Sequence, residues 1–288
     1  MNLEIDRRKV TYRVWHLPHE GDAESLYEDN YHPKLSYWRR TSSGKIRFAV
    51  ADGVSGAYFS GGWASLLTLV FQRGGAPLFT NENLQKLAEI WKEEEISKLQ
   101  NSSTRKESIR KLLEKKIHQV GGSSTINGVE LDLDTDTWNG FSIGDSCMFQ
   151  IRNLEIINQN PQIDFTEFGY QPEQILTVNP GNWRAETNSD SFKNGDMFLL
   201  STDAFARWLL TPHEDYSTEE KIREVNAILS HEEFVKFITR ERRERRMEDD
   251  DVTVSIITIT GEKQNPHRIP HYIGCKRLKT KYLRKGGY

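Results

Sequence analysis

The chain has 288 residues, which is enough for one large domain or two ordinary ones with an ample core. Hydrophobic residues make up 36% and charged residues 28%, a composition that excludes an intrinsically disordered protein. A net charge of −3 gives no overall electrostatic reason to expect nucleic acid binding.

The sequence shows neither a membrane segment nor a targeting signal. No apolar run approaches the roughly 20 residues that cross a bilayer, and residues 1–15 lack the apolar stretch of a signal peptide. Two cysteines are too few for a disulfide framework, and Cys147 is expected to be a buried strand thiol. We therefore expect a cytoplasmic protein that does not enter a membrane.

The first half of the chain predicts a strand followed by helices. Residues 45–51 (KIRFAVA) have the content of a strand, and residues 63–71 have the apolar density of a buried helix. Residues 82–100 repeat apolar positions at helical spacing against a charged back. Residues 105–119 show the same period and end before Gly121, as a helix C-terminus does. The last two segments predict a long antiparallel helix pair.

The second half is richer in strands. Residues 123–152 predict a hairpin with a turn in DTDT and a further strand, and residues 153–195 predict a polar, loop-rich linker. Residues 197–202 predict a buried strand, residues 217–246 helices, and residues 252–260 a strand of alternating β-branched residues. Strands and helices do not alternate strictly, which favours an α+β fold of mostly antiparallel sheets with helices outside.

The end of the chain differs from the rest in charge. Residues 267–288 contain seven Lys or Arg and no acidic residue. The pattern predicts a domain over residues 1–262 and a solvated basic tail over residues 263–288. The alternative is that this tail is a docking arm for an acidic partner.

Five short motifs place a carboxylate where an apolar run meets a turn. A side chain there is spared burial within the sheet and can point into a cleft between sheets. Several carboxylates aimed at one point repel each other unless a cation lies among them, and Mg²⁺ and Mn²⁺ prefer oxygen ligands. We therefore predict an oxygen-lined metal centre built from distant parts of the chain. The motifs are YEDN (27–30), FAVADG (48–53), FSIGDS (141–146), FLLSTDA (198–204) and MEDDDVTV (247–254).

Each motif alone has a simpler interpretation. Asp52–Gly53 is typical of a hairpin turn, and Asp145–Ser146 of a turn or cap. Residues 249–251 alone would be an exposed acidic run. The sequence DLDTDTWNG resembles a calcium loop, but Thr137 stands where the sharp-turn glycine belongs and no Glu closes the loop. The N-terminal histidines lack metal-ligand spacing and are expected at the surface: His16, His19 and His32.

The order of the motifs carries more information than any one of them. YEDN, FAVADG, GGSST, GDSCMFQIR, GDMFLLSTDA and DDDVTV together resemble the metal-dependent serine/threonine phosphatases of the protein phosphatase 2C (PPM) type. The compact bacterial branch is most similar, because there DG is followed by an S-G-x-W-A helix start. The resemblance implies an α-β-β-α sandwich of two antiparallel sheets flanked by helices, with a two-metal site at one end.

The resemblance also implies which residues hold the metal ions. Asp52 matches the carboxylate that bridges both ions, and Gly53 matches the residue whose backbone carbonyl helps hold one of them. Glu28 matches a direct ligand of that second ion. Asp29 beside it matches the residue that orients metal-bound water.

The remaining ligands lie in the second half of the chain. Asp203 and Asp250 match the ligands of the first ion, and Asp145 matches the carboxylate for a third, weaker ion. Two divalent ions, Mn²⁺ or Mg²⁺, would acidify a bridging water and neutralise phosphate oxygens during in-line attack. The resemblance thus assigns Asp52, Asp29 and Asp203 to catalysis.

Departures from the family pattern affect phosphate capture more than metal binding. Many members grip the substrate phosphate with an Arg four residues before the Glu of the ED motif, but Glu24 stands at that position and would repel phosphate. Val54 replaces a His that many eukaryotic members have, and Ala204 replaces the Gly of TDG. Asp251 replaces the usual Asn, and its charge either raises metal affinity or faces solvent.

Three functions are compatible with these residues. The leading one is metal-dependent hydrolysis of phosphoserine and phosphothreonine on a protein substrate, opposing a partner Ser/Thr kinase. The alternative is a catalytically weak phosphatase-fold module that binds and regulates signalling proteins. A nucleic-acid-associated protein would rest only on the basic tail with Tyr272 and Tyr282. The complete ligand set favours the enzyme, because an inactive protein has no chemical need for six aligned carboxylates.

Overall fold

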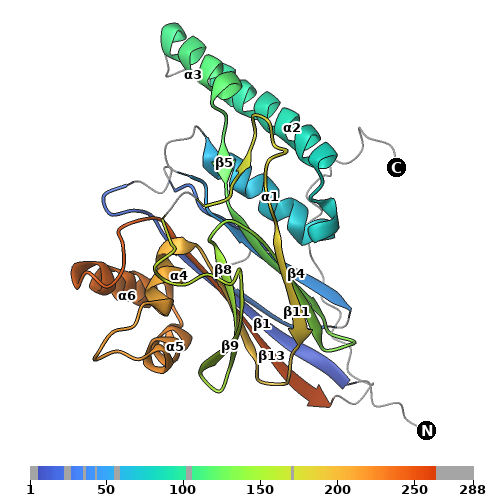
Figure 1. The fold of residues 1–288 in the computed structure, drawn as a ribbon, viewed down its shortest axis with the longest axis vertical. Coiled ribbons are helices and arrows are strands. Elements are labelled where there is room, and N and C mark those ends of the chain that lie inside the picture. Colours follow the sequence, from blue (N-terminus) through green and yellow to red (C-terminus); the bar gives the residue numbers. More distant parts are fainter. Residues whose placement is uncertain are drawn as a thin grey trace.

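Two antiparallel sheets pack face to face, and helices cover the outer face of each (Figure 1). The predicted α+β sandwich is confirmed. The basic tail was predicted over residues 263–288, of which residues 264–288 lie outside the described residues, so the tail and its boundary stay predictions. No helix in the described part of the chain combines the length and the hydropathy needed to cross a bilayer. The computed structural model describes residues 6–22, 27–34, 37–42, 44–54, 59–101, 106–169 and 172–263.

The six-stranded sheet is organised around its longest strands. β1 and β13 pair along twelve residues each, from Asp6 opposite Lys263 to Leu17 opposite Val252. This pairing brings the first described residues beside the last. The strand order is β3 (Tyr37–Ser42), β1 (Asp6–Leu17), β13 (Val252–Lys263), β12 (Met197–Ser201), β8 (Cys147–Arg152) and β9 (Glu155–Asn160).

The five-stranded sheet contains the predicted hairpin. β6 and β7 pair from Ile126 opposite Ile143 to Asp132 opposite Thr137, and the chain then crosses to β8 in the other sheet. A short ladder of β10 (Ile175–Leu176) and β5 (Ser123–Ser124) lies apart from both. The strand order is β11 (Glu186–Ser191), β7 (Thr137–Ile143), β6 (Ile126–Asp132), β4 (Lys45–Ala51) and β2 (Asn30–His32).

Strand β13 shows how the layers follow from sequence. Val252, Val254 and Ile256 belong to the core beneath the C-terminal helices, whereas Ile257 and Ile259 belong to the core between the sheets. Successive side chains of a strand point to opposite faces, so a strand covered on both faces needs apolar residues on both. This explains why VTVSIITIT is almost continuously apolar or β-branched.

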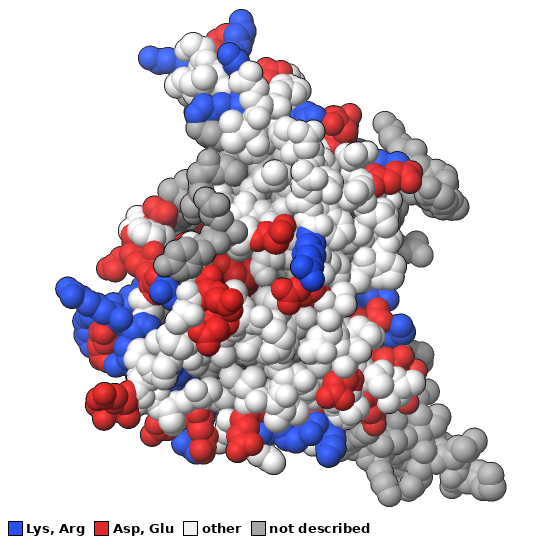
Figure 2. Space-filling view, viewed as in Figure 1, with Lys and Arg blue, Asp and Glu red and all other residues white. Residues whose placement is uncertain are grey.

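Two groups of helices form the outer layers. The predicted helix pair is confirmed as α2 and α3, which extend beyond the sheets (Figure 1). Basic and acidic side chains lie side by side over α5 and α6 (Figure 2). The five-stranded sheet is covered by α1 (Ser60–Gly74), with the 3₁₀ helix η2 (Ala76–Leu78) after it, and α2 (Asn81–Asn101) packs on α1 and α3 (Glu107–Gln119) on α2. The six-stranded sheet is covered by α4 (Asp203–Leu210), α5 (Thr218–Ala227) and α6 (His231–Arg243).

Several sequence predictions were incomplete. Residues 153–195 are not only a linker, since they contain β9, β10 and β11, and the long strand β1 and the helix α4 were not predicted. β9 and β11 are edge strands, so their sequences EIINQN and ETNSDS lack an apolar alternation. His32 is not a surface residue, because it is only 9% exposed and its Nδ1 lies 2.9 Å from Thr68 Oγ1.

The prediction for Cys147 is confirmed. The thiol is fully buried at the start of β8, and its Sγ lies 3.3 Å from the backbone oxygen of Asp145. Burial, reinforced by the nearby charge of Asp145, raises the pKa of the Cys147 thiol well above its usual value. The thiolate is therefore disfavoured in the folded state.

Candidate metal centre

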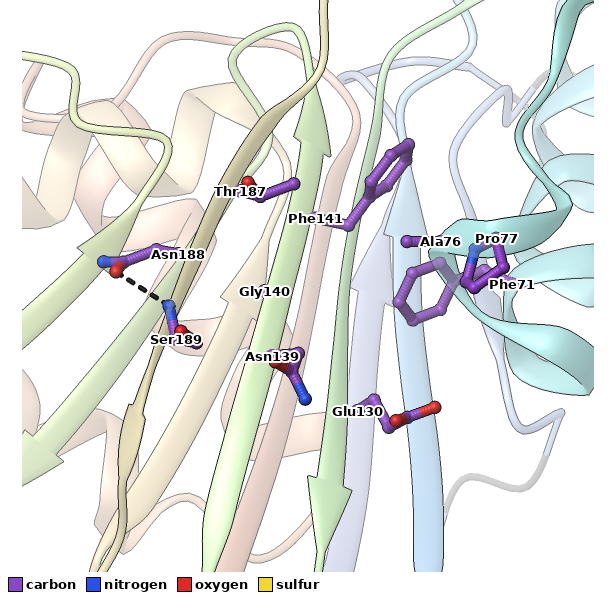
Figure 3. A pocket seen from close by; sticks show the side chains of 10 residues that line it. All are labelled: Phe71, Ala76, Pro77, Glu130, Asn139, Gly140, Phe141, Thr187, Asn188 and Ser189. Atoms are coloured by element: carbon purple, nitrogen blue, oxygen red, sulfur yellow. Dashed lines mark hydrogen bonds between the residues drawn. The ribbon is translucent and has the colours of Figure 1, made fainter.

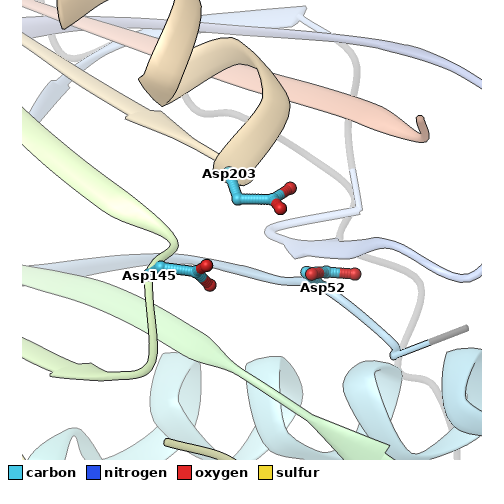
Figure 4. Close-up of side chains that lie close together, drawn as sticks. All are labelled: Asp52, Asp145 and Asp203. Atoms are coloured by element: carbon cyan, nitrogen blue, oxygen red, sulfur yellow. The ribbon is translucent and has the colours of Figure 1, made fainter. Parts of the chain in front are cut away.

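Three carboxylates from separate elements meet at one end of the sandwich. Asp52 follows β4, Asp145 lies in the turn between β7 and β8, and Asp203 begins α4 shortly after β12. An oxygen of each lies within 4.8 Å of an oxygen of the other two (Figure 4). Figure 4 shows the three side chains pointing toward a common space. We call this group the floor of the site.

The floor is electrostatically unfavourable without a cation. Burial raises the pKa of Asp203 to about 8, with the charges of Asp145 and Asp250 adding to it. Burial also raises the pKa of Asp145 to about 6 and that of Asp52 well above its usual range. Asp145 is 2% exposed, and its Oδ1 has no hydrogen-bond partner. An oxygen-only site with an unpartnered buried oxygen fits a hard divalent ion such as Mg²⁺ or Mn²⁺.

Asp29 is a fourth buried carboxylate beside the floor. It is 1% exposed, and its Oδ2 accepts hydrogen bonds from the hydroxyls of Thr202 and Thr253, both at 2.9 Å. Its Oδ1 has no hydrogen-bond partner. Burial raises the pKa of Asp29 well above its usual range, and the charges of Asp251 and Asp203 add to that shift. The two threonines therefore fix the carboxylate and leave one oxygen available.

The GGSST segment holds the backbone of Asp52. The Ser124 hydroxyl donates to the Asp52 carbonyl at 2.7 Å, and the Thr125 N–H donates to the same carbonyl at 2.9 Å. The hydroxyls of Thr125 and Ser146 share a hydrogen bond of 2.7 Å. One short segment thus links the backbone of Asp52 to the turn that carries Asp145.

Two glycines allow the Glu28 segment to approach the floor. A Cβ at Gly53 would lie 2.5 Å from the backbone oxygen of Glu28, and a Cβ at Gly61 would lie 3.2 Å from its Cα. The first distance is too short for any side chain, so position 53 requires glycine, whereas the second would force the Glu28 backbone to move by a few tenths of an ångström. The start of α1 and the DG turn therefore press directly against the backbone of Glu28.

Two other predicted metal ligands, Glu28 and Asp250, do not belong to the floor. The carboxylates of Glu28 and Asp250 are not among the three that lie within 4.8 Å of one another. Asp250 is near enough for its charge to raise the pKa of Asp52 and Asp203, and its Oδ1 accepts the Asp251 N–H at 2.8 Å. Glu24 lies outside the described residues, so its place relative to the site stays a prediction.

A second group of charged residues lies at the start of β13 and the end of α6, and the sequence did not reveal its role. We call Arg242, Asp249 and Asp251 the rim. Asp251 accepts backbone N–H groups from His19 and Glu28, and Arg242 lies 3.4 Å from Asp249. These are contacts between distant segments, which leave no periodic signal in the sequence.

A groove elsewhere on the molecule is not part of this site. It has a volume of about 440 Å³ and lies over the five-stranded sheet, between η2 and β11 (Figure 3). Phe71 and Phe141 line it on the helix side, and Asn188 and Ser189 lie on the β11 side (Figure 3). None of the three floor carboxylates lines this groove, so it is separate from the candidate metal centre.

Comparison with solved structures identifies the fold. A crystal structure of the Mycobacterium tuberculosis serine/threonine phosphatase PstP/Ppp is 16% identical to this chain and covers 88% of it and 99% of its own length, with a TM-score of 0.51. The PstP catalytic domain in complex with two manganese ions gives the same values. The photosystem II phosphatase PBCP is 16% identical, with 86% and 98% covered and a TM-score of 0.51. No family model and no curated protein sequence matches the chain.

The fold is therefore that of the metal-dependent phosphatases of the protein phosphatase 2C type, as the order of motifs implied. At this level of identity the likeness concerns the fold alone. The activity depends on the carboxylates at the end of the sandwich.

Proposed function

We propose that the protein is a Mn²⁺- or Mg²⁺-dependent phosphatase that hydrolyses phosphoserine and phosphothreonine on proteins. The observation that supports this most strongly is the floor, where three carboxylates lie within 4.8 Å of one another and one buried oxygen lacks a partner. Such a group is stable in its ionised form only around cations. In a phosphatase 2C-type fold, that chemistry fits phosphoryl hydrolysis.

The environments of the site residues support separate roles in metal binding and in orienting water. Bound ions would supply Lewis-acid polarisation and an acidified water. Asp52 and Asp203 would hold those ions with Glu28, Asp250 and the Gly53 carbonyl, and Asp145 would hold a third, weaker one. Asp29 would orient the attacking water through its free Oδ1, because its Oδ2 is already bonded to Thr202 and Thr253.

The substrate class and setting extend this proposal. The likeness to a serine/threonine phosphatase supports a phosphoprotein substrate and an opposing Ser/Thr kinase, and we propose the cytoplasm as their setting. Purified protein should release phosphate from a phosphoserine or phosphothreonine peptide with Mn²⁺ and lose that activity with a chelator. Absence of both turnover and Mn²⁺ binding would reject the proposal.

A weak enzyme or regulatory binding module is the second candidate, and Glu24 favours it. If Glu24 occupies the position of the phosphate-gripping Arg, phosphate is held mainly by the ions, and the KM for small aryl phosphates should be high. The two candidates separate in one experiment. A binding module would retain phosphopeptide in equilibrium binding with Mn²⁺ and yet release no phosphate over long incubation.

A further inference from the structure

Asp251 bridges two segments that are far apart in the sequence. It directly precedes β13, and its Oδ1 accepts the His19 N–H at 2.8 Å. Its Oδ2 accepts the Glu28 N–H at 2.7 Å. Each oxygen therefore has a backbone donor at short, charge-assisted distance. One side chain thus joins the start of β13 to the loop after β1 and to the YEDN segment.

The neighbouring rim residues strengthen the same junction. Asp249 Oδ1 accepts the Glu20 N–H at 2.9 Å, and the Arg242 guanidinium donates to the backbone oxygen of Pro18 at 3.0 Å and to that of Asp250. The Arg242 side chain is only 6% exposed. Helix α6 therefore supplies a buried anchor for both the acidic loop and the loop after β1.

The YEDN segment is held from three directions. Gly53 and Gly61 allow close backbone contact on one side, and Thr202 and Thr253 bind Asp29 on another. Asp251 holds the Glu28 N–H on the third. Because this segment carries both Glu28 and Asp29, a shift of its backbone moves a proposed metal ligand and the proposed water-orienting residue together.

We propose that Asp251 is a positioning residue that fixes the Glu28–Asp29 segment over the floor, and that this arrangement requires a carboxylate. The inference rests on the proposed metal-dependent function. An amide at this position has one acceptor oxygen, and its NH₂ group would face a backbone N–H, leaving that donor unpaired. Asp251 thus acts through Glu28 and Asp29, with both of its oxygens engaged by the backbone.

The test compares Asp251→Asn with Glu248→Gln in the full chain. Both variants remove one negative charge from the same loop, but Glu248 is 60% exposed and pairs with Arg207, without a bond to either segment. Amide hydrogen exchange on the metal-free protein should be about tenfold faster in Asp251→Asn at whichever of His19 and Glu28 loses its acceptor, and unchanged at both in Glu248→Gln. Mn²⁺ affinity, from calorimetry well below the melting temperature, should fall about tenfold in Asp251→Asn and far less in the control.

A third variant guards against misfolding. Asp251→Glu keeps two acceptor oxygens, so it should regain protection at one or both amides. If Asp251→Asn does not fold while Asp251→Glu does, the need for two acceptors is supported. Unchanged exchange at His19 and Glu28, or equal loss of Mn²⁺ affinity in Glu248→Gln, would overturn the proposal. Wild-type protein without Mn²⁺ affinity would instead reject the proposed function, and the exchange data would still decide the role of Asp251.

Discussion

The aspartates of the floor and those of the rim are in opposite electrostatic situations. Asp145 on the floor is buried and one of its carboxylate oxygens has no hydrogen-bond partner. Both carboxylate oxygens of Asp251 on the rim accept a hydrogen bond from a backbone N–H. The floor needs a cation in order to be ionised, while the rim is already satisfied by the protein. A candidate metal site is therefore recognised by carboxylates that lack hydrogen-bond donors, and a structural role by carboxylates that have them; the number of acidic residues does not separate the two.

The largest effect is expected on the floor. In Asp203→Asn, turnover should fall more than about a hundredfold, because metal polarisation contributes several kcal/mol to the rate. The metal-free variant should melt no lower than wild type at pH 8, since Asn removes a buried charge and keeps the oxygen that accepts the Ala204 N–H. Phosphate release and thermal melts measure the two effects. Full activity would mean that Asp203 holds no essential ion.

A substitution on the rim should lower the stability of the protein whether or not metal is bound. Arg242→Met removes the donor to the backbone oxygens of Pro18 and Asp250 and the ion pair with Asp249, so stability should fall by roughly 2–3 kcal/mol with or without Mn²⁺. Chemical denaturation in chelator and in Mn²⁺ gives both values. A matched control is Arg243→Met on the same helix, where the side chain is 77% exposed. Equal losses in the two variants would contradict a special role for the rim.

Metal binding should stabilise the protein, and this gain should depend on the floor carboxylates. At a Mn²⁺ concentration about 100 times the dissociation constant, a single site adds about 2.7 kcal/mol to the free energy of unfolding. The gain should disappear in Asp52→Asn and persist in Glu248→Gln. Thermal shift against Mn²⁺ concentration measures it. A gain that survives in Asp52→Asn would place the ion elsewhere.

The pH dependence of the metal-free protein should reveal the floor carboxylates. The pKa of Asp145 is about 6 and that of Asp203 about 8, both above the value of about 3.9 for a free Asp. The folded state therefore binds more protons than the unfolded state between about pH 4 and pH 8, and stability falls as pH rises through that window. Melts in chelator from pH 5 to 8 should show this fall, and Asp203→Asn should flatten its upper part.

The smallest effect is expected from the tail. If the basic tail predicted over residues 263–288 is a solvated appendage, deletion of residues 267–288 should change the free energy of unfolding by less than about 0.5 kcal/mol. Turnover of a small aryl phosphate should also be unchanged. A larger loss in stability would show that the apolar residues of the tail pack on the domain.

The sequence predicted elements with strong periodicity and missed those that depend on tertiary partners. Residues 82–100 and 105–119 became α2 and α3, but the polar edge strands β9 and β11 had no apolar pattern. Lys221 looks like an ordinary charged helix residue, yet it is fully buried and donates to the carbonyls of Trp208 and Thr211. Such contacts exist only after folding.

The candidate site divides in the same way. Asp52, Asp145 and Asp203 could be located from local motifs, because each lies where an apolar strand meets a turn. The role of Asp251 could not, because its two partners are backbone groups more than 220 residues away in the chain. Backbone donors carry no side-chain identity, so no residue pattern marks them.

The buried thiol of Cys147 can be used to measure how often the metal-site end of the sandwich opens to solvent. The side chain is inaccessible and lies two residues from Asp145, so a thiol reagent can reach it only when the end of the sandwich separates. In a Cys275→Ser background, the rate of Cys147 modification would therefore report how often the floor becomes exposed to solvent. Slower labelling with Mn²⁺ than with chelator would show that the ion closes the interior as well as completing the site.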